Sequence, residues 1–523
     1  MAEVESVRFG DRDLDIEDVV GLARGDLRAS LSDEPAYRRR LDRSASLIAA
    51  LAQSGRDVYG VTTGVGASVT NQIPEALRTA MPLNLLRFHG VGTGRMLDEE
   101  EAGAVLAARL ASLCRGYSGV RGQVLERICA LINLRLLPRI PAEGSVGASG
   151  DLTPLSYLAA TLVGEREVTL GGQEMSAALA HEKVELEPLV LEPKESLAIM
   201  NGTSLMTGLA CLAFARARSL AALASTLTAM TSEAIHGNAE HFDDRIFALK
   251  PHPGSRACAS FIREHLARSE ATKSARIQDR YSIRCAPHVI GVLVDALEFS
   301  RAVLTTELNG VNDNPLIDPE SGSVLHGGNF YGGHVCFVMD ALKTAVANVA
   351  DLLDRQLVLL CGSDTSDGLP DNLVAATGAE KLIHHGFKAM QISASALTAE
   401  ALKLTMPASA FSRSTESHNQ DKVSMGAIAA RDCLRILELT ENVAAILLLA
   451  DCQAVDLRGV DEASESTRAV HARVRDEIPM VDVDRRQDLD IRTAVSLHRM
   501  GALPGVGRGD ALFAALASEP RRA

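Results

Sequence analysis

The chain has 523 residues, of which 46% are hydrophobic and none is Trp, and its formal net charge is −14. This composition is typical of a globular protein and excludes an intrinsically disordered one, because the polar bias of disorder is missing. The charge forms no sustained basic stripe, so a nucleic-acid partner is excluded as well.

Targeting and metal-binding signals are also missing. The N-terminus is acidic without an apolar core, and no uncharged apolar run reaches the roughly 18 residues of a transmembrane helix. We therefore expect a cytoplasmic protein with no membrane partner. Nine scattered cysteines form no CxxC pair, which argues against a disulfide framework or a zinc knuckle. With no HExxH and no Walker loop, we expect neither a metal nor a nucleotide cofactor.

Apolar residues recur every three or four positions, which predicts a mainly α protein of long bundled helices with few short β segments. Three regions are expected: an N-terminal region over 1–200, a central long-helix bundle over 201–478, and a C-terminal cap over 479–523. The strand candidates are 167–170 and 184–190. The helix candidates are 205–230, which stops before Gly237, and 289–308, 334–361, 379–404 and 423–454.

Glycine- and asparagine-rich segments separate these helices. Irregular polar loops on a helical scaffold are where functional side chains concentrate. We therefore look for chemistry in five segments: 59–66, 144–150, 201–203, 309–314 and 327–333.

The segment GSVGASGDLTPL at 144–155 has two interpretations. It can be a loop that leads into a helix, with Asp151 among the candidate caps. It can also be reactive, because a tight bend lets the unhindered nitrogen of Gly150 reach the carbonyl of Ala148 and close a five-membered ring. Dehydration of the ring and loss of the Ser149 hydroxyl would leave a methylidene-imidazolone, which is a strong electrophile.

This segment closely resembles the signature of the histidine, phenylalanine and tyrosine ammonia-lyases and the related aminomutases. Further blocks follow in that family's order, and the resemblance covers roughly residues 20–460. One departure is Arg280, which stands where relatives usually have Pro. The other matching blocks are YGVTTGVG at 59–66, NLL at 84–86, MNGT at 200–203, QDRYSIRC at 278–285, DNP at 313–315, GGNF at 327–330 and HNQD at 418–421.

The resemblance implies elimination of ammonia from an aromatic L-amino acid. Ordinary side chains offer no adequate electron sink for that reaction, so an electrophile has to be made. By resemblance it is 4-methylidene-imidazol-5-one, formed autocatalytically from Ala148, Ser149 and Gly150. The substrate adds to it through its amine or through its ring, and the sequence leaves both routes open.

The resemblance also assigns roles to individual side chains. Tyr59 is expected to be the base that takes the β-proton, which requires a phenol that ionises more easily than usual, and positive helix ends would help. Arg284 is expected to hold the substrate carboxylate in a bidentate ion pair. Asn201 and Tyr281 are expected to assist formation or protonation of the electrophile. The remaining expected substrate-binding residues are Phe88, His89, Gln278, Phe330, Glu416, Asn419 and Gln420.

Two positions bear on the choice of substrate. A Phe at position 88 resembles the residue found in phenylalanine ammonia-lyases. A His, such as His89, can hydrogen-bond a phenol, as in tyrosine-specific members of the family. A buried imidazole without a partner costs about 1–3 kcal/mol, which a tyrosine hydroxyl would relieve. Histidine ammonia-lyases have Glu where Gln420 stands. We therefore expect tyrosine first, with p-coumarate as product, then phenylalanine, dihydroxyphenylalanine and histidine.

Other interpretations share these residues. An aminomutase would retain the ammonia and return it to the β-carbon, and the sequence hardly separates the two activities. A catalytically dead helical scaffold is disfavoured, since the base, the carboxylate anchor and the electrophile triad are all present. The family also implies a homotetramer in which each active site combines loops from three subunits, so that an isolated monomer would be inactive.

Overall fold

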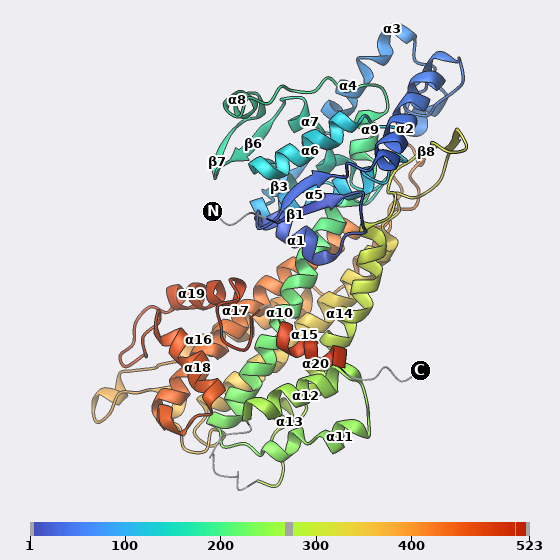
Figure 1. The fold of residues 1–523 in the computed structure, drawn as a ribbon. Helices are drawn as coiled ribbons and strands as arrows, with labels where there is room; N and C mark the ends of the chain where they lie inside the picture. The colour runs from blue at the N-terminus through green and yellow to red at the C-terminus, as the bar shows by residue number, and fades with distance from the viewer. Residues whose placement is uncertain (1–4, 267–275, 508, 519–523) are drawn as a thin grey trace. The chain divides into compact units, whose positions relative to one another are not determined.

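The computed structural model describes residues 5–266, 276–507 and 509–518. Helices dominate it, and its strands are short (Figure 1). The chain divides into two compact units: the first contains 1–213, 301–340 and 407–431, and the second contains 214–300, 341–406 and 432–523. The expectation of a mainly α protein with short β segments is therefore confirmed. The three predicted regions stay a prediction, and both units cut across their boundaries.

Four long helices each run through both units. Their apolar three-and-four spacing buries a broad face, which is what stabilises helices of this length. These helices are α10 (Ser204–Ala234), α14 (Ala286–Leu308), α15 (Gly333–Cys361) and α17 (Gly426–Arg458).

The first unit combines short helices with four small sheets. Strands β1 and β2 pair in parallel, β3 pairs with β5 and β8 with β9 antiparallel, and β4, β6 and β7 form an antiparallel sheet in that order. The strands are β1 (Ser6–Phe9), β2 (Arg28–Leu31), β3 (Thr93–Met96), β4 (Leu136–Pro138), β5 (Pro141–Glu143), β6 (Glu167–Leu170), β7 (Gln173–Ser176), β8 (Leu316–Asp318) and β9 (Ser323–Leu325). The unit's other helices are α1 (Ile16–Arg24), α2 (Pro35–Gln53), η1 (Gly66–Thr70), α3 (Glu75–Arg78), α4 (Met81–Phe88), α5 (Glu99–Leu113), α6 (Gly122–Leu134), α7 (Leu152–Leu162), α8 (Ala177–Lys183), α9 (Glu195–Met200) and η5 (Ala408–Phe411).

In the described part of the second unit the named elements are all helices. Side-chain bonds join the long helices there: Thr231 of α10 donates to Asp451 of α17, and Gln356 of α15 donates to Thr228 of α10. The shorter helices are η2 (Ala239–Phe242), α11 (Asp244–Ala248), α12 (Pro253–Leu266), α13 (Tyr281–Arg284), η3 (Asp371–Leu373), η4 (Glu380–Leu382), α16 (Lys388–Lys403), η6 (Val460–Glu462), α18 (Glu465–Arg475), α19 (Asp488–Arg499) and α20 (Asp510–Ser518).

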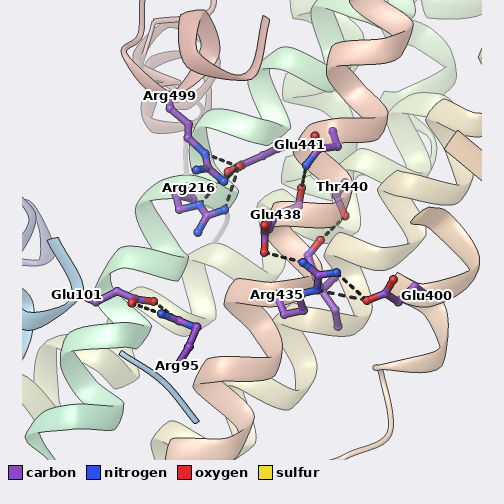
Figure 2. A network of polar contacts seen from close by, with 11 residues as sticks. Arg95, Glu101, Arg216, Glu400, Arg435, Glu438, Thr440, Glu441 and Arg499 are labelled. Atoms are coloured by element: carbon purple, nitrogen blue, oxygen red, sulfur yellow. Dashed lines mark hydrogen bonds and ion pairs between the residues drawn. The ribbon is translucent and has the colours of Figure 1, made fainter. Parts of the chain in front are cut away.

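A network of arginines and carboxylates links helices of the second unit (Figure 2). Glu441 of α17 is fully buried and accepts from Arg216 of α10 and Arg499 of α19 at 2.6–2.9 Å. Arg435 of α17 lies between Glu400 of α16 and Glu438. The predicted C-terminal cap is thus bonded to the long helices, and its residues 508 and 519–523 lie outside the described part.

The helix predictions hold with two differences at the ends. The predicted helices at 205–230, 289–308 and 334–361 lie within α10, α14 and α15. The helix predicted over 379–404 begins only at Lys388, because 379–387 form a short 3-10 turn and an irregular loop. The helix predicted over 423–454 is α17, which begins three residues later and runs on to Arg458.

The strand predictions split. Residues 167–170 form β6 as expected. The strand predicted over 184–190 is wrong: Glu185 has a left-handed backbone with φ 53° and Pro188 cannot donate to a ladder, so the segment is irregular.

One helix passes a length and hydropathy test for a membrane span, although the sequence predicted no such helix. By length and composition α10 could cross a membrane, but 78% of its most apolar stretch is buried inside the protein. Its hydroxyl and amide bonds to α15 and α17 are those of a core helix.

Candidate active site

The electrophile loop has the bent backbone that its proposed chemistry requires. Ser149 and Gly150 both adopt left-handed conformations, with φ of 52° and 76°. A Cβ placed on Gly150 would lie 2.1 Å from the carbonyl oxygen of Gly202, so only glycine fits. The next residue fixes the bend, since the N–H of Asp151 donates to that same carbonyl at 2.7 Å. A left-handed Ser is uncommon and persists only where its surroundings hold it.

Asp151 is the N-cap residue of α7, but its side chain makes no capping hydrogen bond. The fully buried carboxylate instead accepts from the Ser145 hydroxyl at 2.9 Å and from the Met206 N–H at 3.0 Å, which ties the loop to α10. Burial raises the pKa of Asp151 to about 7, against the lowering effect of these hydrogen bonds. The predicted cap position is confirmed, but the expected capping hydrogen bond is not made, because the carboxylate accepts from Ser145 and Met206 instead.

A third segment of the chain closes over the loop. The amide of Gln420 donates to the Ser149 hydroxyl at 3.1 Å, and the N–H of Met425 donates to the Val146 carbonyl at 3.0 Å. A Cβ on Gly147 would lie 2.2 Å from the Ser424 hydroxyl. The loop is thus held between 201–206 and 420–425.

Tyr59 lies in its glycine-rich loop, half-buried. The N–H of Gly66 donates to the phenol oxygen at 2.7 Å, and the neighbouring Ala67 N–H donates to the Glu416 carboxylate at 2.9 Å. Burial raises the pKa of Tyr59 above its ordinary 10.0, the Gly66 bond opposes this, and the Glu416 charge raises the pKa further. The shift is opposite to the one expected of a base, because burial disfavours the charged phenolate and the Glu416 carboxylate adds to that effect.

Phe88 and His89 lie at the C-terminal end of α4, beside the start of α7. Their ring centroids are 4.0 Å apart, and the His89 carbonyl accepts from the Ser156 hydroxyl in the first half of α7. Nδ1 of His89 is 2.9 Å from the Leu85 carbonyl, so it carries the proton and Nε2 is left as an acceptor. Burial and the nearby Arg166 charge lower the pKa of His89 below its ordinary 6.5, against the raising effect of the Leu85 bond.

Asn201 follows α9 and is 2% exposed. Its amide nitrogen donates to the Asn314 carbonyl at 2.7 Å, whereas its buried side-chain oxygen has no hydrogen-bond partner. Phe330 is half-buried in the turn before α15, next to Gly332, which approaches Thr203 and Met206. Asn419 is exposed, and its N–H donates to the Glu416 carbonyl at 3.0 Å.

The remaining predicted residues form a separate cluster in the second unit. Tyr281 and Arg284 begin and end the four-residue α13, and the guanidinium lies 4.6 Å from the centre of the Tyr281 ring. The Arg284 Nε donates to the Asp279 carbonyl at 3.1 Å. Gln278 is exposed and Tyr281 is 71% exposed. The first unit thus contains the predicted base and the electrophile loop, and the second unit contains the predicted carboxylate anchor.

The residues present fit a methylidene-imidazolone. The ring needs a glycine nitrogen turned back toward Ala148, and the left-handed bend at Ser149 and Gly150 supplies that turn.

Three charged residues near the electrophile loop were not predicted as site residues. Arg109, Lys194 and Asp313 are completely buried. A sequence signal existed for Arg109, because a single Arg interrupts the otherwise apolar run of α5, where an unpaired charge would be costly.

Comparison with known proteins identifies the family of this chain. The family model described as "Aromatic amino acid lyase" matches residues 14–476. The chain belongs to the aromatic amino acid lyase family. Its fold and its ammonia-lyase class are those that the sequence predicted, and both expectations are confirmed.

Individual members of the aromatic amino acid lyase family match over almost the whole chain. Histidine ammonia-lyases of Gloeobacter violaceus and Koribacter versatilis are 38% and 37% identical, covering 94% and 90% of this chain and 95% and 94% of theirs. The tyrosine aminomutase of Streptomyces globisporus has a similar structure, with a TM-score of 0.89, 33% identity and 99% coverage of both chains. The histidine ammonia-lyase of Trypanosoma cruzi also has a similar structure, with a TM-score of 0.88, 31% identity and 99% coverage of both chains.

Proposed function

We propose that this aromatic amino acid lyase converts L-tyrosine to trans-p-coumarate and ammonia. The observation that carries this choice is the state of His89: its Nδ1 is engaged by Leu85 and its neutral Nε2 can accept the hydrogen bond of a phenol. Gln420 supports it, because a neutral amide and not a carboxylate contacts Ser149. An imidazole-bearing substrate would gain no charge partner from that amide.

The chain's own residues have distinct tasks in this proposal. Ala148, Ser149 and Gly150 form the methylidene-imidazolone, which supplies the electron sink for departure of the amine. Tyr59 takes the β-proton through its phenol oxygen, which the Gly66 N–H helps to hold in place. Arg284 binds the substrate carboxylate, and the half-buried Phe330 packs near the reacting carbons.

We also propose that the active enzyme is a cytoplasmic homotetramer. The cluster of Gln278, Tyr281 and Arg284 is largely exposed in one chain, although carboxylate binding and catalysis require a desolvated site. Packing of subunits would cover this cluster and deliver it to another chain's electrophile loop.

Histidine is the second candidate substrate. The curated relatives named above are histidine ammonia-lyases, and a histidine side chain could also hydrogen-bond Nε2 of His89. Phenylalanine is the third, since the 58%-exposed Phe88 presents an apolar ring beside His89.

The test is to incubate purified protein separately with L-tyrosine, L-phenylalanine and L-histidine and to follow the unsaturated acid and the ammonia together. Tyrosine should give equal amounts of p-coumarate and ammonia. A β-amino acid without free ammonia would mean an aminomutase. Urocanate from histidine at the highest kcat/KM would overturn the choice of tyrosine.

His89→Phe sharpens this test. Removing the acceptor should lower the tyrosine-to-phenylalanine ratio of kcat/KM by roughly 100-fold. Phe88→Leu is the matched control, because it changes the neighbouring ring and leaves Nε2 intact. A ratio that moves equally in both variants would contradict the assigned contact.

A further inference from the structure

A sealed group of charges lies under the electrophile loop in the first unit. Lys194 and Asp313 form an ion pair, 2.6 Å between Nζ and Oδ2, and neither side chain is exposed to any extent. Arg109, also completely buried, is attracted by the charges of Asp313 and of Asp151. Burying such charges is costly, so a merely stabilising role would be served better by apolar side chains of the same volume.

The ion pair is bonded to Asn201. The second oxygen of Asp313, Oδ1, accepts from the Asn201 amide nitrogen at 3.3 Å and from the Asn314 N–H at 2.7 Å. Together with the Asn314 carbonyl, this uses both hydrogens of the Asn201 amide. The amide is thereby fixed through its nitrogen, and its buried oxygen has no hydrogen-bond partner.

Arg109 holds the backbone next to that amide. Its guanidinium donates to the Asn312 carbonyl at 3.0 Å and to the Asn201 carbonyl at 3.4 Å. A Cβ on Gly202 would lie 2.0 Å from Arg109 Nη1, so the guanidinium packs directly on Gly202. The carbonyl of Gly202 is the one that receives the Asp151 N–H and leaves no room at Gly150.

We infer that Lys194, Asp313 and Arg109 are positioning residues for formation of the electrophile. They hold Asn201 and Gly202, and Gly202 in turn holds the bend at Ser149 and Gly150. This inference rests on the proposed self-formed methylidene-imidazolone. Nothing in it requires these three residues to touch the substrate.

The step they serve conserves all atoms. The Gly150 nitrogen bonds to the Ala148 carbonyl carbon, and that carbonyl oxygen leaves as water with the N–H hydrogens of Gly150 and Ser149. The Ser149 hydroxyl then leaves as a second water with the Cα hydrogen, which creates the exocyclic double bond. No oxidant or reductant is needed. Because the reacting atoms are all in one chain, the rate depends on how well the bend brings them together.

The experiment measures cyclisation directly by intact mass. Full-length Lys194→Met and the double variant Lys194→Met/Asp313→Asn are purified, and the fraction of chains that has lost two waters is followed over time. We expect the loss to appear roughly 10- to 100-fold more slowly in both than in the wild-type protein. Lys194→Met should lower the urea midpoint, because it leaves the buried Asp313 carboxylate unpaired. The double variant should have a midpoint near the wild-type value, because that carboxylate is also removed.

Glu441→Gln is the matched control, because it removes an equally buried, arginine-paired carboxylate from the second unit. It should lower the urea midpoint and leave the rate of water loss unchanged. Asp313→Asn alone keeps the shape of the side chain and carries the test if the double variant does not fold.

The outcomes separate this inference from the proposed function. A double variant that is folded and loses two waters at the wild-type rate would overturn the inference and leave the proposed function standing. A wild-type protein that never loses two waters would overturn both. If Glu441→Gln slowed the water loss as much as Lys194→Met, the slowing would be explained by lower stability of the whole protein. That result would contradict the positioning role.

Discussion

The two units bury charge in different ways. In the first unit, Arg109 and Lys194 bond to the backbone and side chains of irregular segments beneath a strained loop. In the second unit, Glu441 and Arg435 join one regular helix to another. Buried charge therefore shapes the backbone in one unit and sets helix packing in the other. Substitutions in the first should change chemistry more than stability, and substitutions in the second should do the reverse.

Ser149→Ala is expected to have the largest effect. Without the hydroxyl no methylidene can form, so kcat/KM should fall by at least about 10⁴-fold. The free energy of unfolding should change by less than about 1 kcal/mol, because one half-buried oxygen is lost. Activity assays and urea unfolding measure the two quantities, and a large loss of stability would weaken the contrast between the units.

Tyr59→Phe tests the base while the electrophile stays intact. We expect kcat to fall by about 10²- to 10⁴-fold, which is the usual contribution of a positioned base. The two-water loss should be complete in this variant, since Tyr59 makes no hydrogen bond to the electrophile loop among the described contacts. A variant that fails to cyclise would move Tyr59 from catalysis to formation of the group.

Glu441→Gln tests the second unit. Removing the carboxylate leaves two arginines facing a neutral amide, and we expect the free energy of unfolding to fall by about 1–3 kcal/mol. The kcat per cyclised site should stay within about threefold of the wild-type value, because Glu441 is not one of the residues proposed to act in the reaction. Urea unfolding with activity normalised to cyclised chains measures both.

Glu416→Gln should give the smallest effect, a shift in titration. The Glu416 charge raises the pKa of Tyr59, so its removal should lower that pKa and move ionisation of the phenol to lower pH. Ultraviolet difference titration of the free enzyme, with Tyr59→Phe as the reference, follows the phenolate itself. Since phenolate is the active form, the alkaline rise of kcat/KM should move to lower pH as well. A titration shifted to higher pH would contradict the assignment.

The sequence predicted the helices and the chemical groups well, because both are encoded locally. Apolar spacing located α10, α14 and α15, and Gly150 was singled out because a tight bend demands glycine. The strand at 184–190 was wrongly predicted, since β-branched residues outweighed Pro188 in the pattern.

What the sequence missed depends on contacts between distant segments. The side chain of Asp151 had been expected to cap α7, but its partners Ser145 and Met206 come from both sides of it along the chain. The ion pair of Lys194 with Asp313 joins residues 119 positions apart. No local pattern shows that two such charges will form a buried ion pair.

The bond from Met425 to Val146 has a consequence for the order of events in biosynthesis. The electrophile loop has all of its described contacts only when residues 420–425 have closed over it. A nascent chain that has emerged only through α10 already contains Ala148, Ser149, Gly150 and Gly202 but lacks the bonds from Gln420 and Met425. We therefore expect ring closure to be fastest after residues 420–425 have been synthesised.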